Sequence, residues 1–163
     1  IKYNKKIIAS DSKNLDSYLR LGFAYLQSRD LVNAKKYYKK ALKLQPKNNL
    51  AQQSIERIKI LEGKKSKKGK VTNIKFDPNM FLEIPGKTKS VNLFKLGQKN
   101  TLAQLTIGQK VFLKPKKRKM EIRTETNEYI GSVPDDLSKS LYLFIKGGNL
   151  YEGFIQDFSL NKV

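Results

Sequence analysis

The chain of 163 residues contains 34 lysines and arginines but only 14 aspartates and glutamates, which gives a formal net charge of +20. It contains no cysteine and no histidine, so disulfides, Cys/His zinc sites, thiol nucleophiles and histidine-based acid–base chemistry are excluded. No apolar run reaches the ~20 residues that a transmembrane helix needs, and no signal-peptide core is present. We expect a cytoplasmic protein that is not an enzyme and binds no cofactor or metal.

The excess of positive charge is concentrated toward the start of the chain. Residues 1–70 hold 19 basic and 5 acidic residues, whereas residues 71–163 hold 15 and 9. A balance this basic favours a polyanionic partner, such as nucleic acid, a ribonucleoprotein or an anionic membrane surface. The alternative is a lysine-rich proteome in which lysine is the default surface residue. The charge alone does not separate these two explanations.

The first fourteen residues predict the end of a helix. Tyr3, Ile7 and Ile8 fall on one helical face. The polar residues 10–14 then interrupt the pattern and offer N-caps for a following helix. This segment is typical of the last helix of a preceding repeat, so we expect at least one more repeat upstream.

Residues 15–48 carry the pattern of two helices joined by a turn. The signature positions are Tyr18, Leu21, Gly22, Tyr25, Ala34, Tyr38, Ala41 and Pro46. Their spacing resembles the tetratricopeptide repeat family, with tyrosines at the usual tryptophan and phenylalanine positions. The pattern predicts helices over residues 15–28 and 31–44, with Asp30 as N-cap of the second. Residues 49–62 predict a further helix that caps the solenoid, so residues 1–62 form an all-α repeat segment.

The resemblance implies that a protein partner is held in the concave groove of the repeat. The residues expected to line this groove are Asp16, Leu19, Arg20, Phe23 and Gln27. Leu19 and Phe23 suit an apolar groove for a helix or an extended peptide. Alternatively, these two side chains pack against an upstream repeat.

The chain has two clusters of basic residues. One directly follows the repeat segment, and the other lies in the second half of the chain. Residues 63–70 read GKKSKKGK and predict a linker, because such a segment has nothing to bury. We expect both clusters to contact the phosphates of RNA or DNA; the alternative is a solvated surface. The expected contact residues are Lys64, Lys65, Lys67, Lys68, Lys70, Lys114, Lys116, Lys117, Arg118 and Lys119. Six further lysines are expected on the second repeat helix, where they form either a basic outer stripe or a solvated face: Lys35, Lys36, Lys39, Lys40, Lys43 and Lys47.

Residues 71–163 predict a small, mostly-β domain. A turn at Gly108 leads into a strand that ends near Pro115, and further strands are expected over residues 120–124, 129–133 and 150–158. Pro134 opens a short helix. We expect an OB/SH3-like barrel with one helix, which makes the whole chain an α+β protein of two domains.

The step from strand to helix in this domain resembles the HIRAN family of small β-barrels. The matching residues are Tyr129, Ile130, Gly131, Val133, Pro134, Leu137 and Leu141. The resemblance implies an OB-like barrel. Asp135 and Asp136 stand where family members often carry a basic residue, so we carry over the fold and not the family's binding of single-stranded DNA ends. We expect the two carboxylates to favour the helix N-terminus through its dipole.

Together these patterns predict a non-catalytic adaptor. Its basic clusters would bind nucleic acid or a ribonucleoprotein, while the repeat recruits a protein. The alternative is a protein–protein interaction scaffold with no nucleic-acid role.

Overall fold

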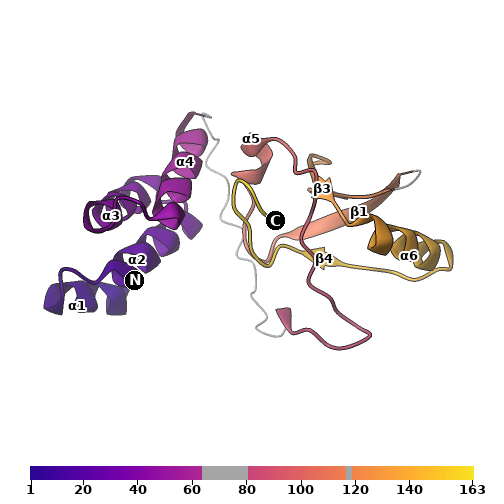
Figure 1. Cartoon of the computed structure of the whole chain (residues 1–163), viewed down its shortest axis with the longest axis horizontal. Helices are drawn as coiled ribbons and strands as arrows, with labels where there is room; N and C mark the ends of the chain where they lie inside the picture. Colours follow the sequence, from indigo (N-terminus) through magenta and orange to yellow (C-terminus); the bar gives the residue numbers. More distant parts are fainter. Residues whose placement is uncertain (64–80, 117–118) are drawn as a thin grey trace. The chain divides into compact units, whose positions relative to one another are not determined.

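The computed structural model describes residues 1–63, 81–116 and 119–163. The chain divides into two compact units, Ile1–Thr72 and Asn73–Val163 (Figure 1). Among the described residues, no helix has the length and apolar character needed to cross a membrane. The predicted linker, residues 63–70, lies outside the described part except for Gly63, which ends a helix.

The first unit consists of helices that pack in chain order. They are α1 (Lys2–Ser10), α2 (Leu15–Gln27), α3 (Leu31–Leu44) and α4 (Asn49–Gly63). Each helix contacts the next one along the chain. The predicted helices over residues 15–28, 31–44 and 49–62 are therefore confirmed to within one residue. The core between them contains Leu21, Tyr38 and Ile58, which are almost completely buried.

Three helices of this unit begin with the same capping interaction. The side chains of Asn14, Asp30 and Asn48 each accept a hydrogen bond from the backbone N–H three residues later, at 2.9, 3.0 and 3.0 Å. Such caps satisfy N–H groups that have no partner inside the helix. They fix where α2, α3 and α4 begin, and the cap predicted at Asp30 is confirmed.

The second unit is built on an antiparallel sheet. Its strands are β1 (Lys110–Lys116), β2 (Lys119–Arg123), β3 (Tyr129–Ser132) and β4 (Gly153–Phe154), in the order β3-β2-β1-β4. Helix α6 (Asp135–Lys146) packs against β2. The strands predicted near residues 110–115, 120–124 and 129–133 and the helix after Pro134 are confirmed.

The prediction of a closed barrel is wrong, because the sheet stays open. Within the described residues, β3 and β4 form its two edges and do not pair with each other. The strand expected over residues 150–158 is reduced to Gly153–Phe154. Closing a small barrel requires strands that are long enough to tilt and continue the ladder around the axis, and a two-residue strand cannot do this.

A segment before β1 completes the core and was not predicted. Phe94 and Ser132 exchange two backbone hydrogen bonds of 2.8 Å, and the Gly97 N–H donates to the Ile130 carbonyl at 2.8 Å. A short helix, α5 (Lys99–Leu102), follows and buries Leu102. This segment places residues 94 and 95 beside β3.

Candidate functional site

The five predicted groove residues form one stripe along α2. Asp16, Leu19, Phe23 and Gln27 follow one another at three to four residues, which puts them on one helix face, and Arg20 lies beside Leu19 at its border. Asp16 and Arg20 are exposed, Leu19 is half-buried, and Phe23 is 45% exposed. Gln27 is half-buried, and its Nε2 atom is buried without a hydrogen-bond partner in the described part of the chain. The accessible part of this α2 stripe is therefore centred on Phe23 and Arg20.

Aromatic rings and lysines pack together between α1, α2 and α3. The rings of Tyr25 and Tyr37 are stacked with their centroids 5.4 Å apart. The Lys5 ammonium lies 5.9 Å from the Tyr25 ring, and the Lys40 ammonium lies 5.7 Å from the Tyr18 ring. A hydrogen bond with Tyr25 is the main reason that the pKa of Lys5 is raised. These contacts are cation–π interactions, so Lys5 and Lys40 have structural partners.

The lysines of α3 differ in their surroundings. Lys35 forms an ion pair of 2.7 Å with Glu62 of α4. In contrast, four lysines of the predicted outer stripe are exposed and form no side-chain hydrogen bond or ion pair with another described residue: Lys36, Lys39, Lys43 and Lys47. Lys47 was predicted on this helix but lies beyond its end at Leu44. The basic stripe thus exists as a surface feature, although Lys35 and Lys40 contribute to packing.

Arg57 of α4 is a buried cation that sequence reasoning missed. Only 8% of it is exposed. Burial, and to a smaller extent the charge of Arg29, lowers the pKa of Arg57 to about 10. Arg29 lies in the turn before α3 with a positive φ of 59°. No local sequence signal indicates such a pair, because Arg29 in the turn before α3 and Arg57 in α4 are far apart in the sequence.

The second basic cluster lies on the β1–β2 hairpin. Lys116 and Lys119 are opposite each other in the strand register, and Lys114 is opposite Glu121. All three lysines are exposed, and the Lys114 ammonium donates a hydrogen bond of 2.7 Å to Asn127 Oδ1. The remaining predicted phosphate contacts lie outside the described residues: Lys64, Lys65, Lys67, Lys68, Lys70, Lys117 and Arg118.

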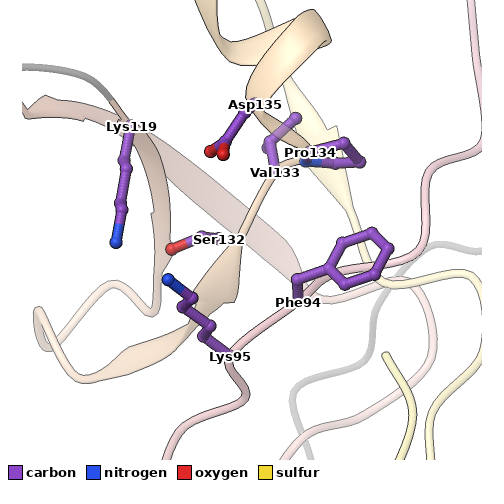
Figure 2. A pocket seen from close by; sticks show the side chains of 7 residues that line it. All are labelled: Phe94, Lys95, Lys119, Ser132, Val133, Pro134 and Asp135. Carbon is purple, nitrogen blue, oxygen red and sulfur yellow. The ribbon is translucent and has the colours of Figure 1, made fainter.

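A pocket of about 260 Å³ opens at the edge of the sheet in the second unit. Three chain segments build it: the stretch before α5, the start of β2, and the step from β3 into α6. Figure 2 shows the lining residues Phe94, Lys95, Lys119, Ser132, Val133, Pro134 and Asp135. Of these, only Lys119 belongs to the residues predicted to bind a ligand.

Hydrogen bonds of Tyr129 join two of the residues that line this pocket, Lys95 and Ser132. The Tyr129 hydroxyl donates a hydrogen bond of 2.7 Å to the Lys95 carbonyl and lies 2.9 Å from Ser132 Oγ. Ser132 is only 6% exposed. In the described residues no group of three or more acidic side chains is placed to hold a metal ion.

Comparison with known families identifies one repeat. Residues 15–48 match the tetratricopeptide repeat model, and they span α2 and α3. No curated protein and no solved structure matches the chain. The repeat is therefore confirmed, and it suggests protein–protein interaction. The HIRAN-like barrel has no support from the comparisons, and the open sheet contradicts the barrel; the repeat gives no support to nucleic-acid binding.

Proposed function

We propose that the chain is a non-catalytic adaptor whose repeat unit binds a segment of a partner protein along the α2 stripe. The observation that carries this proposal is the exposure of Phe23, which is 45% exposed in the middle of the stripe. In comparison, Tyr18 on the same helix packs in the core and is only 6% exposed. An exposed phenylalanine on a repeat helix is suited to cover an apolar side chain of a bound peptide.

The charge of the unit favours an acidic partner. Residues 1–70 hold 19 basic and 5 acidic residues, and Arg20 lies three residues before Phe23 on the same face. A partner segment that combines an apolar side chain with neighbouring carboxylates would match both the exposed Phe23 ring and the positive charge around it. Opposite charges would also raise the rate of encounter.

Peptide selection against the full chain tests this proposal. Acidic twelve-residue peptides with one central leucine or phenylalanine would be selected, and their affinities measured by fluorescence anisotropy. Truncating a central anchor costs about 2 kcal/mol or more, so Phe23→Ala should weaken the selected peptides at least about tenfold. Val32→Ala is the control, because Val32 is 77% exposed on α3 and lies off the stripe. Equal affinity for both variants would show that the stripe is not the binding surface.

A second candidate function is contact with the phosphates of RNA or DNA. The observation that favours it is the hairpin of β1 and β2, where Lys116 and Lys119 are exposed and directly opposite each other. Two ammonium groups at one end of a hairpin can neutralise neighbouring phosphates. The competing explanation remains a lysine-rich proteome.

A salt series separates these explanations. Binding of single-stranded RNA and duplex DNA to the full chain would be measured against a variant with Lys116, Lys117, Arg118 and Lys119 changed to glutamine. Each lost phosphate contact should reduce the slope of log K against log salt by about 0.7–0.9. The matched control changes Lys36, Lys39, Lys43 and Lys47 to glutamine. Negligible binding near physiological salt, or equal slopes for variant and parent, would exclude the hairpin as a phosphate site.

A further inference from the structure

We propose that the pocket beside β3 binds a carboxylate carried by an apolar group. The pocket lies wholly within the second unit and is separate from the α2 stripe. The proposal therefore does not depend on the function proposed for the repeat. It rests on the charge, the backbone geometry and the size of the pocket.

Two ammonium groups converge on the pocket from different segments. Figure 2 shows the side chains of Lys95 and Lys119 directed toward the space beside the Ser132 hydroxyl. Within the part of the chain that the structure describes, neither ammonium forms an ion pair or a hydrogen bond. Since the Tyr129 hydroxyl donates its proton to the Lys95 carbonyl, the Ser132 hydroxyl donates to Tyr129 and can only accept from a further group. The two ammonium groups are therefore the donors that would hold an anionic oxygen ligand.

The backbone of Lys95 is held in an unfavourable conformation. Its φ is +49°, a region that non-glycine residues seldom adopt and that Asn and Asp tolerate better than lysine does. The backbone pairs made by Phe94 and Gly97 clamp it from both sides, and the Tyr129 hydroxyl holds its carbonyl. Backbone strain of this kind gathers at ligand sites, where the surrounding structure fixes a side chain in advance. The backbone of Lys95, and with it the start of its side chain, is thus fixed before a ligand arrives.

The charge of the pocket selects a monoanion. The two lysines and Asp135 have a formal sum of one positive charge. Asp135 is the first residue of α6, where its carboxylate also stabilises the helix N-terminus. One carboxylate would complete the charge balance, whereas a phosphate dianion would exceed it.

The size and the apolar wall of the pocket define the rest of the ligand. The volume of about 260 Å³ is smaller than the roughly 300–1,000 Å³ of sites that enclose whole small ligands. It therefore suits the end of a ligand rather than an entire cofactor. Phe94, which is 59% exposed, forms an apolar wall with Val133 and Pro134. The matching chemistry is a single apolar side chain next to a carboxylate, supplied either by the C-terminal residue of a peptide or by a free small acid.

Titration of the full chain with defined probes tests this site and its source. The probes are 3-phenylpropanoate, a pentapeptide ending in phenylalanine with a free carboxylate, the same peptide as its C-terminal amide, and inorganic phosphate. Chemical shifts of the Lys95, Ser132 and Val133 amides report binding by nuclear magnetic resonance. We expect a free-carboxylate probe to bind and the amide to bind at least about tenfold more weakly, since one charge-assisted contact is lost. The tighter of the two acids identifies the source as a chain end or a small molecule.

Variants of the two lysines complete the test. Lys95→Asn tolerates the positive φ, and Lys119→Gln keeps a polar side chain of similar length; each should weaken the free carboxylate about tenfold. Lys146→Gln at the end of α6 is the matched control and should bind as the parent does. The proposal is overturned if no free carboxylate binds, if the amide binds equally, if phosphate binds more tightly, or if the lysine variants keep full affinity.

Discussion

Gly22 of α2 lies against the ring of Tyr38 of α3. A Cβ atom placed at Gly22 would come within 2.9 Å of three ring carbons of Tyr38. The ring cannot easily move away, because Tyr38 is only 1% exposed. This contact sets the separation of the two repeat helices, and it explains why a glycine occupies a helix interior where alanine would otherwise be favoured by about 1 kcal/mol.

Replacing this glycine should therefore destabilise the first unit. For Gly22→Ala, the overpacking cost of about 1–3 kcal/mol outweighs the gain in helix propensity of about 1 kcal/mol. We expect a net loss of up to about 2 kcal/mol in the free energy of unfolding, measured by urea denaturation with circular dichroism at 222 nm. Gly63→Ala is the control, because nothing lies within 4 Å of a Cβ at Gly63. A stability of Gly22→Ala equal to or above that of the parent would contradict the close packing.

In the second unit, Gly97 should tolerate substitution least. A Cβ there would lie 2.1 Å from the Tyr129 carbonyl oxygen, which belongs to the backbone and cannot rotate away. We expect Gly97→Ala to separate the segment before α5 from β3 and to cost about 3 kcal/mol or more. Hydrogen exchange of the Phe94 and Gly97 amides measures this loss. Gly147→Ala is a suitable control, since the nearest atoms to its Cβ would be at 3.4 Å; similar exchange in both variants would refute the prediction.

We predict that the stability of the first unit depends on pH through the N-cap of α3. The Asp30 carboxylate accepts hydrogen bonds from the Asn33 side chain and backbone, at 2.7 and 3.0 Å. These bonds, the side-chain bond first, lower the pKa of Asp30 below its ordinary value of 3.8. Because the folded pKa is the lower one, the stabilisation is complete above about pH 3.8 and is lost as the pH falls through the folded value.

Asp30→Ala should accordingly cost about 1 kcal/mol at pH 7. The difference from the parent should shrink as the pH falls below 3.8. Urea denaturation across the pH range measures both values. Asp30→Asn keeps an N-cap acceptor without the charge, so at pH 7 its stability should lie between those of the parent and Asp30→Ala, and it should lose the pH dependence. A cost of Asp30→Ala that is the same at pH 7 and pH 2.5 would show that the charge of the cap does not matter.

The strained backbone at Lys95 predicts a stabilising substitution. A positive φ costs a non-glycine residue about 1–2 kcal/mol, and glycine avoids this cost. Glycine also makes the unfolded chain more flexible, which lowers the stability by about 0.4–1 kcal/mol and offsets part of the gain. Lys95→Gly should therefore raise the free energy of unfolding of the second unit by up to about 1 kcal/mol, measured by thermal and urea denaturation. Lys89→Gly serves for comparison, because Lys89 is an exposed loop residue without a positive φ. A destabilised Lys95→Gly variant would mean that the side chain supports the fold.

The elements of both units could be predicted where their signals are local. The helices α2 and α3 are separated by three residues and pack directly on each other. Their contacts therefore recur at fixed spacing, as between Tyr18 and Tyr37 and between Gly22 and Tyr38. The strands β1 to β3 likewise follow from short alternating runs and the turns between them. The contact of the predicted groove residues with a peptide remains a prediction.

The sequence by itself therefore determined the repeat, its caps and most strands, because these depend on neighbours close in the chain. Only the tertiary structure decided that the sheet stays open, since closure depends on pairing between distant strands and β4 has two residues. The tertiary structure also forms the pocket, because it brings together Lys95, Lys119 and Ser132 from three separate segments. No local pattern marks Lys95, whose positive φ arises from backbone pairs with β3. Long-range pairing, rather than the residue types alone, created this candidate binding site.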